Sequence, residues 1–179
     1  MSRRSCFALL LAAVAAVAYF VAPALVRRHV DGLIQHAVGR PWPAFTLVDR
    51  AGRTWTDADL RGRRAVLHFF RSRCHSCDGE AAAIRDLEGN LPADVVLLHV
   101  VTDALQGYPP AESATTIASK AFAGPVAMAD AKFADSFHKS SWSQVTPITY
   151  VADAAGVVRY GLRGAQSRAA IEQALAAVR

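Results

Sequence analysis

The residues best suited to chemistry in this sequence are two cysteines separated by two residues, Cys74 and Cys77. They follow an apolar run, residues 65–70, and the second directly precedes a helix-like segment, residues 78–87. The N–H groups in the first turn of a helix are unpaired and carry partial positive charge, which lowers the pKa of a thiol placed there. A second thiol about one turn away can attack a mixed disulfide formed by the first. The spacing therefore predicts thiol–disulfide exchange.

Two other roles for the cysteine pair are weaker. A pair with this spacing is half of a zinc site, but structural zinc usually takes four ligands, and no second pair of this kind follows. Histidines are the remaining candidate ligands: His68, His75, His99 and His138. A purely structural disulfide across so short a loop would restrict little unfolded-state entropy. The third cysteine, Cys6, lies at the start of an apolar run and is expected to be passive, so we expect no metal site.

The N-terminus contains a segment long enough to cross a membrane. Residues 7–26 include no charged side chain, and Arg27 and Arg28 follow them. At about 1.5 Å per residue this run spans a hydrocarbon core of roughly 30 Å. Three interpretations remain open: an uncleaved anchor, a secretory signal peptide cut after Ala24, and a buried helix of a soluble domain. The anchor is the leading prediction.

The net charge of +5 is concentrated near this segment. Arg3, Arg4, Arg27 and Arg28 contribute four of the 20 basic side chains, and the first of the 15 acidic residues is Asp31. The rest of the chain is therefore almost neutral, which argues against nucleic-acid binding. Anionic lipid headgroups are the partner that these arginines fit best.

The pattern divides the chain into an anchor or signal segment at 1–28, a linker at 29–40 and one domain at 41–179. The predicted strands are 42–48, 54–56, 65–70, 94–101, 126–128, 148–152 and 157–161. The predicted helices are 74–87, 111–122, 131–138 and 167–178. Strands alternate with helices before a hairpin and a last helix close the unit, which is typical of an α/β fold with a mixed sheet.

The order of a strand, the cysteine pair, a helix and, much later, Thr146-Pro147 before another strand resembles the thioredoxin-like fold. The N-terminal anchor, the segment 43–45 that leads a hairpin, and Glu80 three residues after Cys77 extend the resemblance. The whole pattern is similar to the membrane-anchored TlpA/ResA/CcmG-like thiol–disulfide oxidoreductases, over about residues 41–179. The resemblance implies a mixed sheet flanked by helices.

By this resemblance Cys74 is the exposed nucleophile and Cys77 the more buried, resolving thiol. Pro147 matches the family's cis-proline, and Thr146 would offer backbone groups to an extended substrate segment; an ordinary trans proline that begins a strand is the alternative. His75 lies beside the nucleophile. Trp142 either lines the substrate groove or belongs to the core.

Two residues could handle the proton of the resolving thiol. His68 precedes Cys74 by six residues, where thioredoxins carry a buried acid, and it either exchanges this proton or is a core histidine bonded to backbone. Glu80 matches an acidic residue that this branch places near the cysteines; it either tunes the pair or is a solvated residue of the first helical turn.

The chain also departs from the branch around the nucleophile. Arg73 stands where the family commonly has tryptophan, and the dipeptide His75-Ser76 lacks the usual proline. Arg71, Arg73 and His75 could stabilise the thiolate and make the disulfide more oxidising. They could also form a basic rim that selects an acidic partner, or they could simply be solvated.

The leading functional hypothesis is an extracytoplasmic reductase of protein disulfides, of the cytochrome c maturation or copper-site assembly type. It would sit in a bacterial inner membrane with its domain in the periplasm, or be released there if cleaved, and a membrane donor would re-reduce it. We expect no cofactor beyond the Cys74–Cys77 disulfide. The alternatives are a disulfide-forming oxidant, a copper-binding thiol protein that uses both cysteines with His138, and a peroxidase of the peroxiredoxin type.

Overall fold

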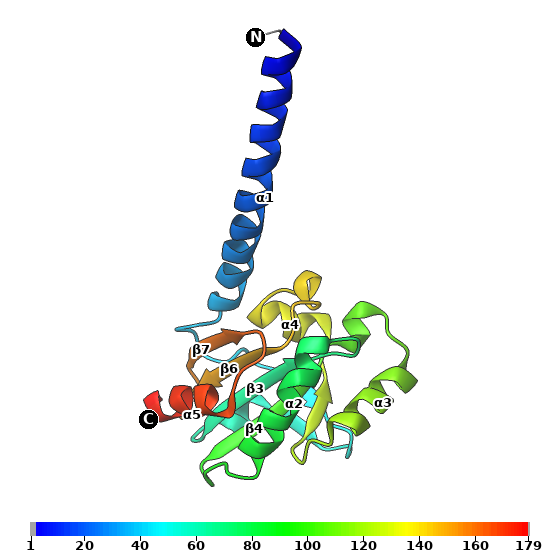
Figure 1. Cartoon of the computed structure of the whole chain (residues 1–179). Helices are drawn as coiled ribbons and strands as arrows, with labels where there is room; N and C mark the ends of the chain where they lie inside the picture. The colour runs from blue at the N-terminus through cyan, green and yellow to red at the C-terminus, as the bar shows by residue number, and fades with distance from the viewer. Residues whose placement is uncertain (1–2, 179) are drawn as a thin grey trace. The chain divides into compact units, whose positions relative to one another are not determined.

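The computed structural model describes residues 3–178 and divides into two compact units, one up to Leu33 and one from Ile34 onward (Figure 1). The division falls inside the stretch predicted to be a linker. In the first unit, α1 (Arg3–Gln35) contains the apolar segment. Residues Leu10–Gln35 have a mean hydropathy of 2.0 and are long enough to cross a membrane. Such a helix near the N-terminus is compatible with an anchor or with a signal segment.

The helix extends further than the sequence pattern suggested. It ends at Gln35, within the predicted linker, because no proline or positive-φ glycine interrupts residues 29–35; the first such glycine is Gly39, with a φ of 82°. Ile34 is buried in the second unit, and the Gln35 side chain donates a hydrogen bond to the carbonyl oxygen of Gly161 at 2.8 Å. The packed domain therefore begins several residues before position 41.

A five-stranded mixed sheet forms the centre of the second unit, with the strand order β5-β4-β3-β6-β7. The strands are β3 (Arg64–Phe70), β4 (Val95–Val101), β5 (Val126–Met128), β6 (Ile148–Ala152) and β7 (Val158–Arg163). β3, β4 and β5 are parallel, whereas β6 and β7 are antiparallel to their neighbours. The continuous apolar runs in β3 and β4 are buried on both faces, as strands in the middle of a covered sheet must be. The predicted thioredoxin-like architecture is confirmed.

The remaining elements cover the sheet or lie at its ends. The helices are α2 (His75–Glu88), α3 (Pro110–Lys120), α4 (Ala131–Phe137) and α5 (Arg168–Ala177). A small hairpin, β1 (Thr46–Val48) and β2 (Thr54–Thr56), and three short 3-10 turns complete the domain: η1 (Asp57–Leu60), η2 (Asp103–Gln106) and η3 (Ser140–Trp142). The sequence pattern did not predict η2 and η3, because neither has an apolar period of its own.

Helix α2 lies across β3 and β4 and positions the cysteines (Figure 1). Its Ile84 and Leu87 pack with Val66 and Leu97 of these strands in one core cluster. A second cluster surrounds Cys74 and Cys77 and is formed with residues of β3, β4, α3 and β5: Phe70, Val101, Ile117 and Val126. The N-terminal end of α2 is thus fixed against the sheet at the point where β3 ends.

Candidate active site

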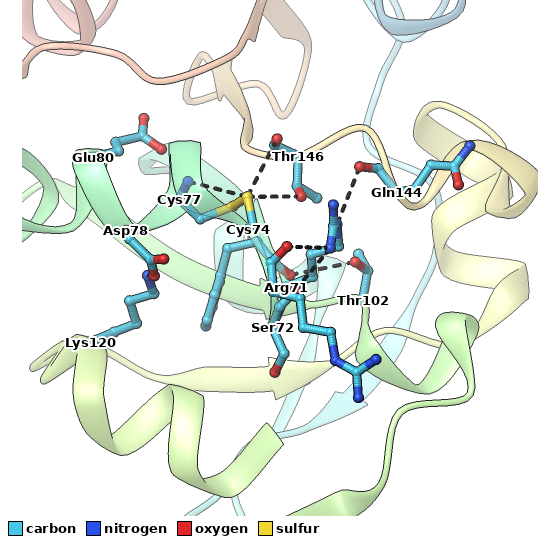
Figure 2. Close-up of a disulfide and its surroundings, with 12 residues drawn as sticks. Arg71, Ser72, Cys74, Cys77, Asp78, Glu80, Thr102, Lys120, Gln144 and Thr146 are labelled. Carbon is cyan, nitrogen blue, oxygen red and sulfur yellow. Dashed lines mark hydrogen bonds and ion pairs between the residues drawn. A yellow bond between two sulfur atoms is a disulfide. The ribbon is translucent and has the colours of Figure 1, made fainter. Parts of the chain in front are cut away.

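Cys74 and Cys77 form a disulfide at the start of α2, with an S–S distance of 2.04 Å and Cα atoms 5.2 Å apart (Figure 2). Cys74 was predicted to be the first residue of this helix. It is instead the N-cap, and the helix begins at His75. Between the end of β3 and this cap, Arg73 adopts a φ of 52°, in the left-handed region that turns the chain sharply. The short loop thus places the first sulfur directly over the open N-terminus of the helix.

The sulfur of Cys74 has two hydrogen-bond donors and one carbonyl oxygen beside it (Figure 2). The Cys77 N–H donates to it at 3.2 Å, and the Thr146 hydroxyl donates at 3.4 Å. The carbonyl oxygen of Thr146 lies 3.6 Å away, where a reduced Cys74 thiol could donate to it. The two donors and the helix N-terminus favour a thiolate at Cys74, whereas the carbonyl favours the protonated thiol. The balance between thiol and thiolate at Cys74 therefore depends on groups that all lie within 4 Å of its sulfur.

Cys74 is less accessible than the resemblance implied. Its exposed fraction is 5 %, and that of Cys77 is 1 %. The relative order agrees with a nucleophile and a buried resolving thiol, but the description of Cys74 as exposed is wrong for the disulfide form. Both sulfurs belong to the core cluster around α3, and Thr146 contacts Cys74. In the disulfide form Cys74 therefore offers little surface to a partner.

The predicted substrate-binding residues lie on the two segments that carry Cys74 and Thr146. The Thr146–Pro147 peptide bond is cis, and the Pro147 carbonyl accepts a hydrogen bond from the Gly164 N–H at 2.9 Å. The Thr146 N–H is bonded to the Gln144 carbonyl at 3.1 Å. His75 is exposed as the first residue of α2, and Trp142 is half-buried in η3, on the segment that leads to Thr146. Thr146 contacts the disulfide directly.

Arg71 joins the two loops of the site. Its Nη1 donates to the carbonyl oxygens of Ser72 and Arg73, both at 2.9 Å, and its Nε donates to the Gln144 carbonyl at 3.3 Å (Figure 2). The sequence left three roles open for Arg71: stabilising the thiolate, forming a basic rim, or being solvated. The structure instead shows a guanidinium that satisfies three carbonyl oxygens and holds the loop before Cys74 next to the loop before Thr146.

Arg73 is paired and is therefore not a free cation beside the nucleophile. Its guanidinium makes two hydrogen bonds of 2.7 Å to the Glu112 carboxylate and lies 4.6 Å from the centroid of the Tyr108 ring. The hydrogen bonds from Arg73 hold the pKa of Glu112 below its ordinary value. Similarly, Asp78 of α2 pairs with the buried Lys120 of α3. Two of the charged residues predicted to act on Cys74, Arg73 and Asp78, are thus held in ion pairs.

His68 and Glu80 meet inside the domain, where sequence reasoning left both of their roles open. Their exposed fractions are 1 % and 2 %, and His68 Nε2 lies 3.3 Å from Glu80 Oε2. Glu80 Oε1 accepts the Gln166 N–H at 2.9 Å. Glu80 is therefore not a solvated first-turn residue, and the hydrogen bonds of His68 go to side chains instead of backbone. Figure 2 shows Glu80 one turn beyond Cys77 on α2.

A second histidine–glutamate pair extends this contact. His68 Nδ1 lies 3.0 Å from His99 Nδ1, and His99 Nε2 lies 2.8 Å from Glu88 Oε1. Glu88 also accepts the N–H groups of Gly124 at 2.7 Å and Ala123 at 3.0 Å. Burial, partly offset by the hydrogen bond with Glu88, lowers the pKa of His99 to about 4. Burial acts to raise the pKa of Glu88, but these hydrogen bonds outweigh it and hold that pKa below its ordinary value.

Comparison with known proteins identifies the family of this domain. The AhpC/TSA family model matches residues 38–161, which is more than half of the chain. The chain belongs to the AhpC/TSA family. A search of curated proteins gives no significant match.

Solved structures with this fold include several thiol–disulfide oxidoreductases. The exposed lipoprotein thioredoxin Etrx1 of Streptococcus pneumoniae is 21% identical, with a TM-score of 0.66 over 76% of this chain and 100% of that one. A thioredoxin-family thiol:disulfide interchange protein of Chlorobium tepidum is 20% identical, with a TM-score of 0.61 over 77% and 94% of the two chains. StoA of Bacillus subtilis is 15% identical, with a TM-score of 0.61 over 76% and 97%. The chain thus carries the fold and the Cys74–Cys77 disulfide of a thioredoxin-like thiol–disulfide oxidoreductase.

A metal centre finds no support in the part of the chain that the structure describes. Within residues 3–178, no group of three or more His, Cys, Asp or Glu side chains is placed to hold an ion. His138, which the copper hypothesis required, is buried against Phe69 and Tyr150, with the Tyr150 hydroxyl 3.4 Å from its Nδ1.

Proposed function

We propose that this protein is an extracytoplasmic thiol–disulfide oxidoreductase that reduces disulfides in protein substrates. The observation that carries the proposal is the position of Cys74 at the N-terminus of α2, with two donors aimed at its sulfur and Cys77 bonded behind it. Membership of a thioredoxin-like family and the names of its structural neighbours support this chemistry. The family implies thiol groups of proteins as substrates.

The reaction needs only the two cysteines as its redox group. In the reduced enzyme, the Cys74 thiolate attacks one sulfur of the partner's disulfide, so that a mixed disulfide forms and the partner's other sulfur leaves as a thiolate. Cys77 then loses its proton and attacks the Cys74 sulfur. The mixed disulfide breaks, the second partner thiolate leaves, and two electrons have passed to the partner. The enzyme is left with the Cys74–Cys77 disulfide.

The segment before Pro147 is the proposed contact for the substrate backbone. The Thr146 carbonyl is adjacent to the Cys74 sulfur, so a peptide bound there in extended form would bring its own sulfur close to Cys74. The Thr146 N–H would have to exchange its bond to the Gln144 carbonyl for one to the peptide. His75 and Trp142 are proposed to lie on either side of the bound peptide.

We place the protein in a bacterial inner membrane with its domain in the periplasm, or free in the periplasm if the N-terminal segment is cleaved. The apolar helix supports this proposal. A membrane electron donor would return the disulfide to the dithiol, and apocytochrome c or a copper-site assembly protein would be the client.

The Arg73–Glu112 ion pair favours a reductase over an oxidant, because it compensates one of the two arginines that could make the disulfide more oxidising. Arg71 binds neutral carbonyl oxygens and keeps its positive charge, which acts in the opposite direction. The deciding measurement is the reduction potential of the full chain, equilibrated in dithiothreitol or glutathione buffers. A potential near or below roughly −270 mV, as in thioredoxin, is expected for a reductase. A potential near roughly −120 mV, as in a strong oxidant, would overturn the proposed direction.

A further inference from the structure

The four buried side chains Glu80, His68, His99 and Glu88, which we call the histidine–glutamate chain, contain more protons than their ordinary ionisation provides. They make three successive contacts, of 3.3, 3.0 and 2.8 Å. Each contact joins two lone-pair atoms and is attractive only if one proton lies in it. Two neutral imidazoles and two carboxylates supply only two protons. A third proton must therefore be bound, because an unmade contact between buried polar atoms is strongly unfavourable.

The surroundings place this third proton at the end near the cysteines. Glu88 accepts three N–H donors, from His99, Gly124 and Ala123, and is thereby held as a carboxylate. A neutral His99 that donates through Nε2 has a bare Nδ1, which must accept from His68 Nδ1. His68 Nε2 then faces Glu80, and the third proton lies between these two atoms. Glu80 has one other described donor, the Gln166 N–H.

The groups packed around the histidine–glutamate chain separate most of it from solvent. Both glutamates come from α2, the two histidines are partners in the β3–β4 register, and β6 places Thr149 opposite His68. The ring of Phe122 stacks on His99 with centroids 4.2 Å apart, and Phe70 stacks on His68 at 5.6 Å. Two ion pairs on the same helix are directed elsewhere: Asp78 pairs with Lys120 of α3, and Asp86 pairs with Arg168 of α5.

The far end of the chain approaches the surface. The Glu88 side chain is 6 % exposed, whereas those of Glu80 and His99 are fully buried. The residues that hold Glu88, Ala123 and Gly124, line a surface cleft of about 610 Å³. One end of the histidine–glutamate chain is thus one helical turn from Cys77, and the other lies next to this surface cleft.

We propose that the histidine–glutamate chain is a proton relay between Cys77 and the cleft at Gly124. This inference rests on the proposed function, in which Cys77 must lose a proton before it resolves the mixed disulfide. The Cys77 S–H bond breaks and its proton enters at Glu80. Each hydrogen bond then passes one proton onward, from Glu80 to His68, to His99 and to Glu88, and Glu88 releases one to water. The relay ends with the same number of protons as at the start, but each histidine then carries its proton on the other ring nitrogen. The reverse run, when the disulfide is reduced, restores the original arrangement.

The test separates the two chemical steps of the reduced full chain in detergent micelles. With the disulfide 5,5′-dithiobis(2-nitrobenzoate), attack by Cys74 releases one thionitrobenzoate, and resolution by Cys77 releases a second. The relay variants are His99→Gln and Glu88→Gln. Glu88→Asp is the conservative variant that keeps a carboxylate. His138→Gln is the matched control, because His138 is also a buried histidine but contacts Tyr150 instead of the relay.

We expect the first release to keep its rate in every variant. The second release should slow about tenfold or more in His99→Gln and Glu88→Gln, as is typical when an internal proton acceptor is lost. It should also become proportional to hydroxide concentration, because hydroxide must then remove the proton. Glu88→Asp should restore most of the rate, and His138→Gln should match the unmodified protein. A mere packing defect would not convert a flat pH profile into a hydroxide-dependent one.

Each outcome decides a different point. An unmodified protein that shows no second release would overturn the proposed function itself, whatever the relay variants do. Two normal releases with unchanged pH profiles in His99→Gln and Glu88→Gln would overturn the relay. The proton count is tested without any variant by ¹⁵N shifts of the histidine rings and by infrared bands of protonated carboxyl groups in the oxidised protein. Finding neither a protonated carboxyl nor an imidazolium would refute the third proton.

Discussion

The hydroxyl of Thr146 offers a direct test of how this site controls its sulfur. It donates to Cys74 Sγ at 3.4 Å, alongside the Cys77 N–H at 3.2 Å. Replacing Thr146 with valine removes the donor and keeps the shape of the side chain. A hydrogen bond to a charged acceptor contributes about 1.5–3 kcal/mol, and one to a neutral acceptor about 0.5–1.5 kcal/mol. The thiolate therefore loses about 1 kcal/mol more than the disulfide does.

This difference has a defined sign and size. The reduced form is destabilised wherever Cys74 is a thiolate, so the reduction potential should fall by about 20 mV, because about 30 mV corresponds to 1.4 kcal/mol. The pH midpoint for alkylation of Cys74 by iodoacetamide should rise by about 0.7 units. Both quantities are measured on the full chain in detergent, in dithiothreitol buffers and by a pH series of alkylation rates.

Thr149→Val is the matched control for this substitution. Thr149 is a fully buried threonine of β6, and its hydroxyl has no hydrogen-bond partner in the described part of the chain. Its replacement should leave the potential and the alkylation midpoint unchanged, and should leave stability equal or higher because an unsatisfied polar atom is removed. Equal potentials in Thr146→Val and Thr149→Val, whether both unchanged or both lowered, would refute this role of the Thr146 hydroxyl.

Two further predictions concern the fold. A Cβ atom at Gly161 would lie 2.9 Å from Ile34 Cγ2 and 3.1 Å from Tyr150 Cε1, so Gly161→Ala should destabilise the domain by about 1–3 kcal/mol in thermal unfolding. Gly79→Ala, where a Cβ meets nothing within 4 Å in helix α2, should instead stabilise it slightly; equal effects would contradict the packing at β7. Burial lowers the pKa of both His99 and His138 from 6.5 to about 4. Between these pH values the unfolded chain binds protons at both residues and the folded chain does not, so stability should decline as pH falls from about 6.5 toward 4. His138→Gln should make this decline shallower, and an unchanged slope in the unfolding midpoint against pH would refute the contribution of His138.

The sequence predicts most of the secondary structure because the main elements have local signals. The apolar runs of β3 and β4, the proline at the start of α3 and the turn before β7 each mark an element on their own. The end of α1 is different, because the helix continues into a stretch of mixed charge that has no proline or positive-φ glycine until Gly39. The linker prediction rested on this mixed charge and on the lack of a firm pattern, and neither of these ends a helix.

The sequence reveals the cysteine pair of the site but not the contact between His68 and His99, because that contact depends on strand register. His68 and His99 meet because β3 and β4 pair in parallel with these two residues as partners, and no local pattern specifies that register. Glu80 and Glu88 share a face of α2 because eight residues are slightly more than two helical turns. A reader of the sequence could have found the glutamate spacing, but its meaning appears only once the helix is placed over the paired histidines.

Charge pairing explains why the number of ionisable residues near Cys74 in the sequence does not decide whether the protein reduces or forms disulfides. Three basic and two acidic residues surround the pair in the sequence, yet Arg73 is bound to Glu112, Asp78 to Lys120, and Glu80 to His68. A paired charge acts on the sulfur mainly as a dipole, whose influence falls off faster than that of a free charge. What remains near the sulfur is the helix N-terminus, the Thr146 hydroxyl and carbonyl, and the Arg71 guanidinium, whose three carbonyl partners are neutral. The potential should therefore respond more strongly to Thr146→Val than to Glu112→Gln, which frees Arg73 in a largely solvated position where screening weakens its field.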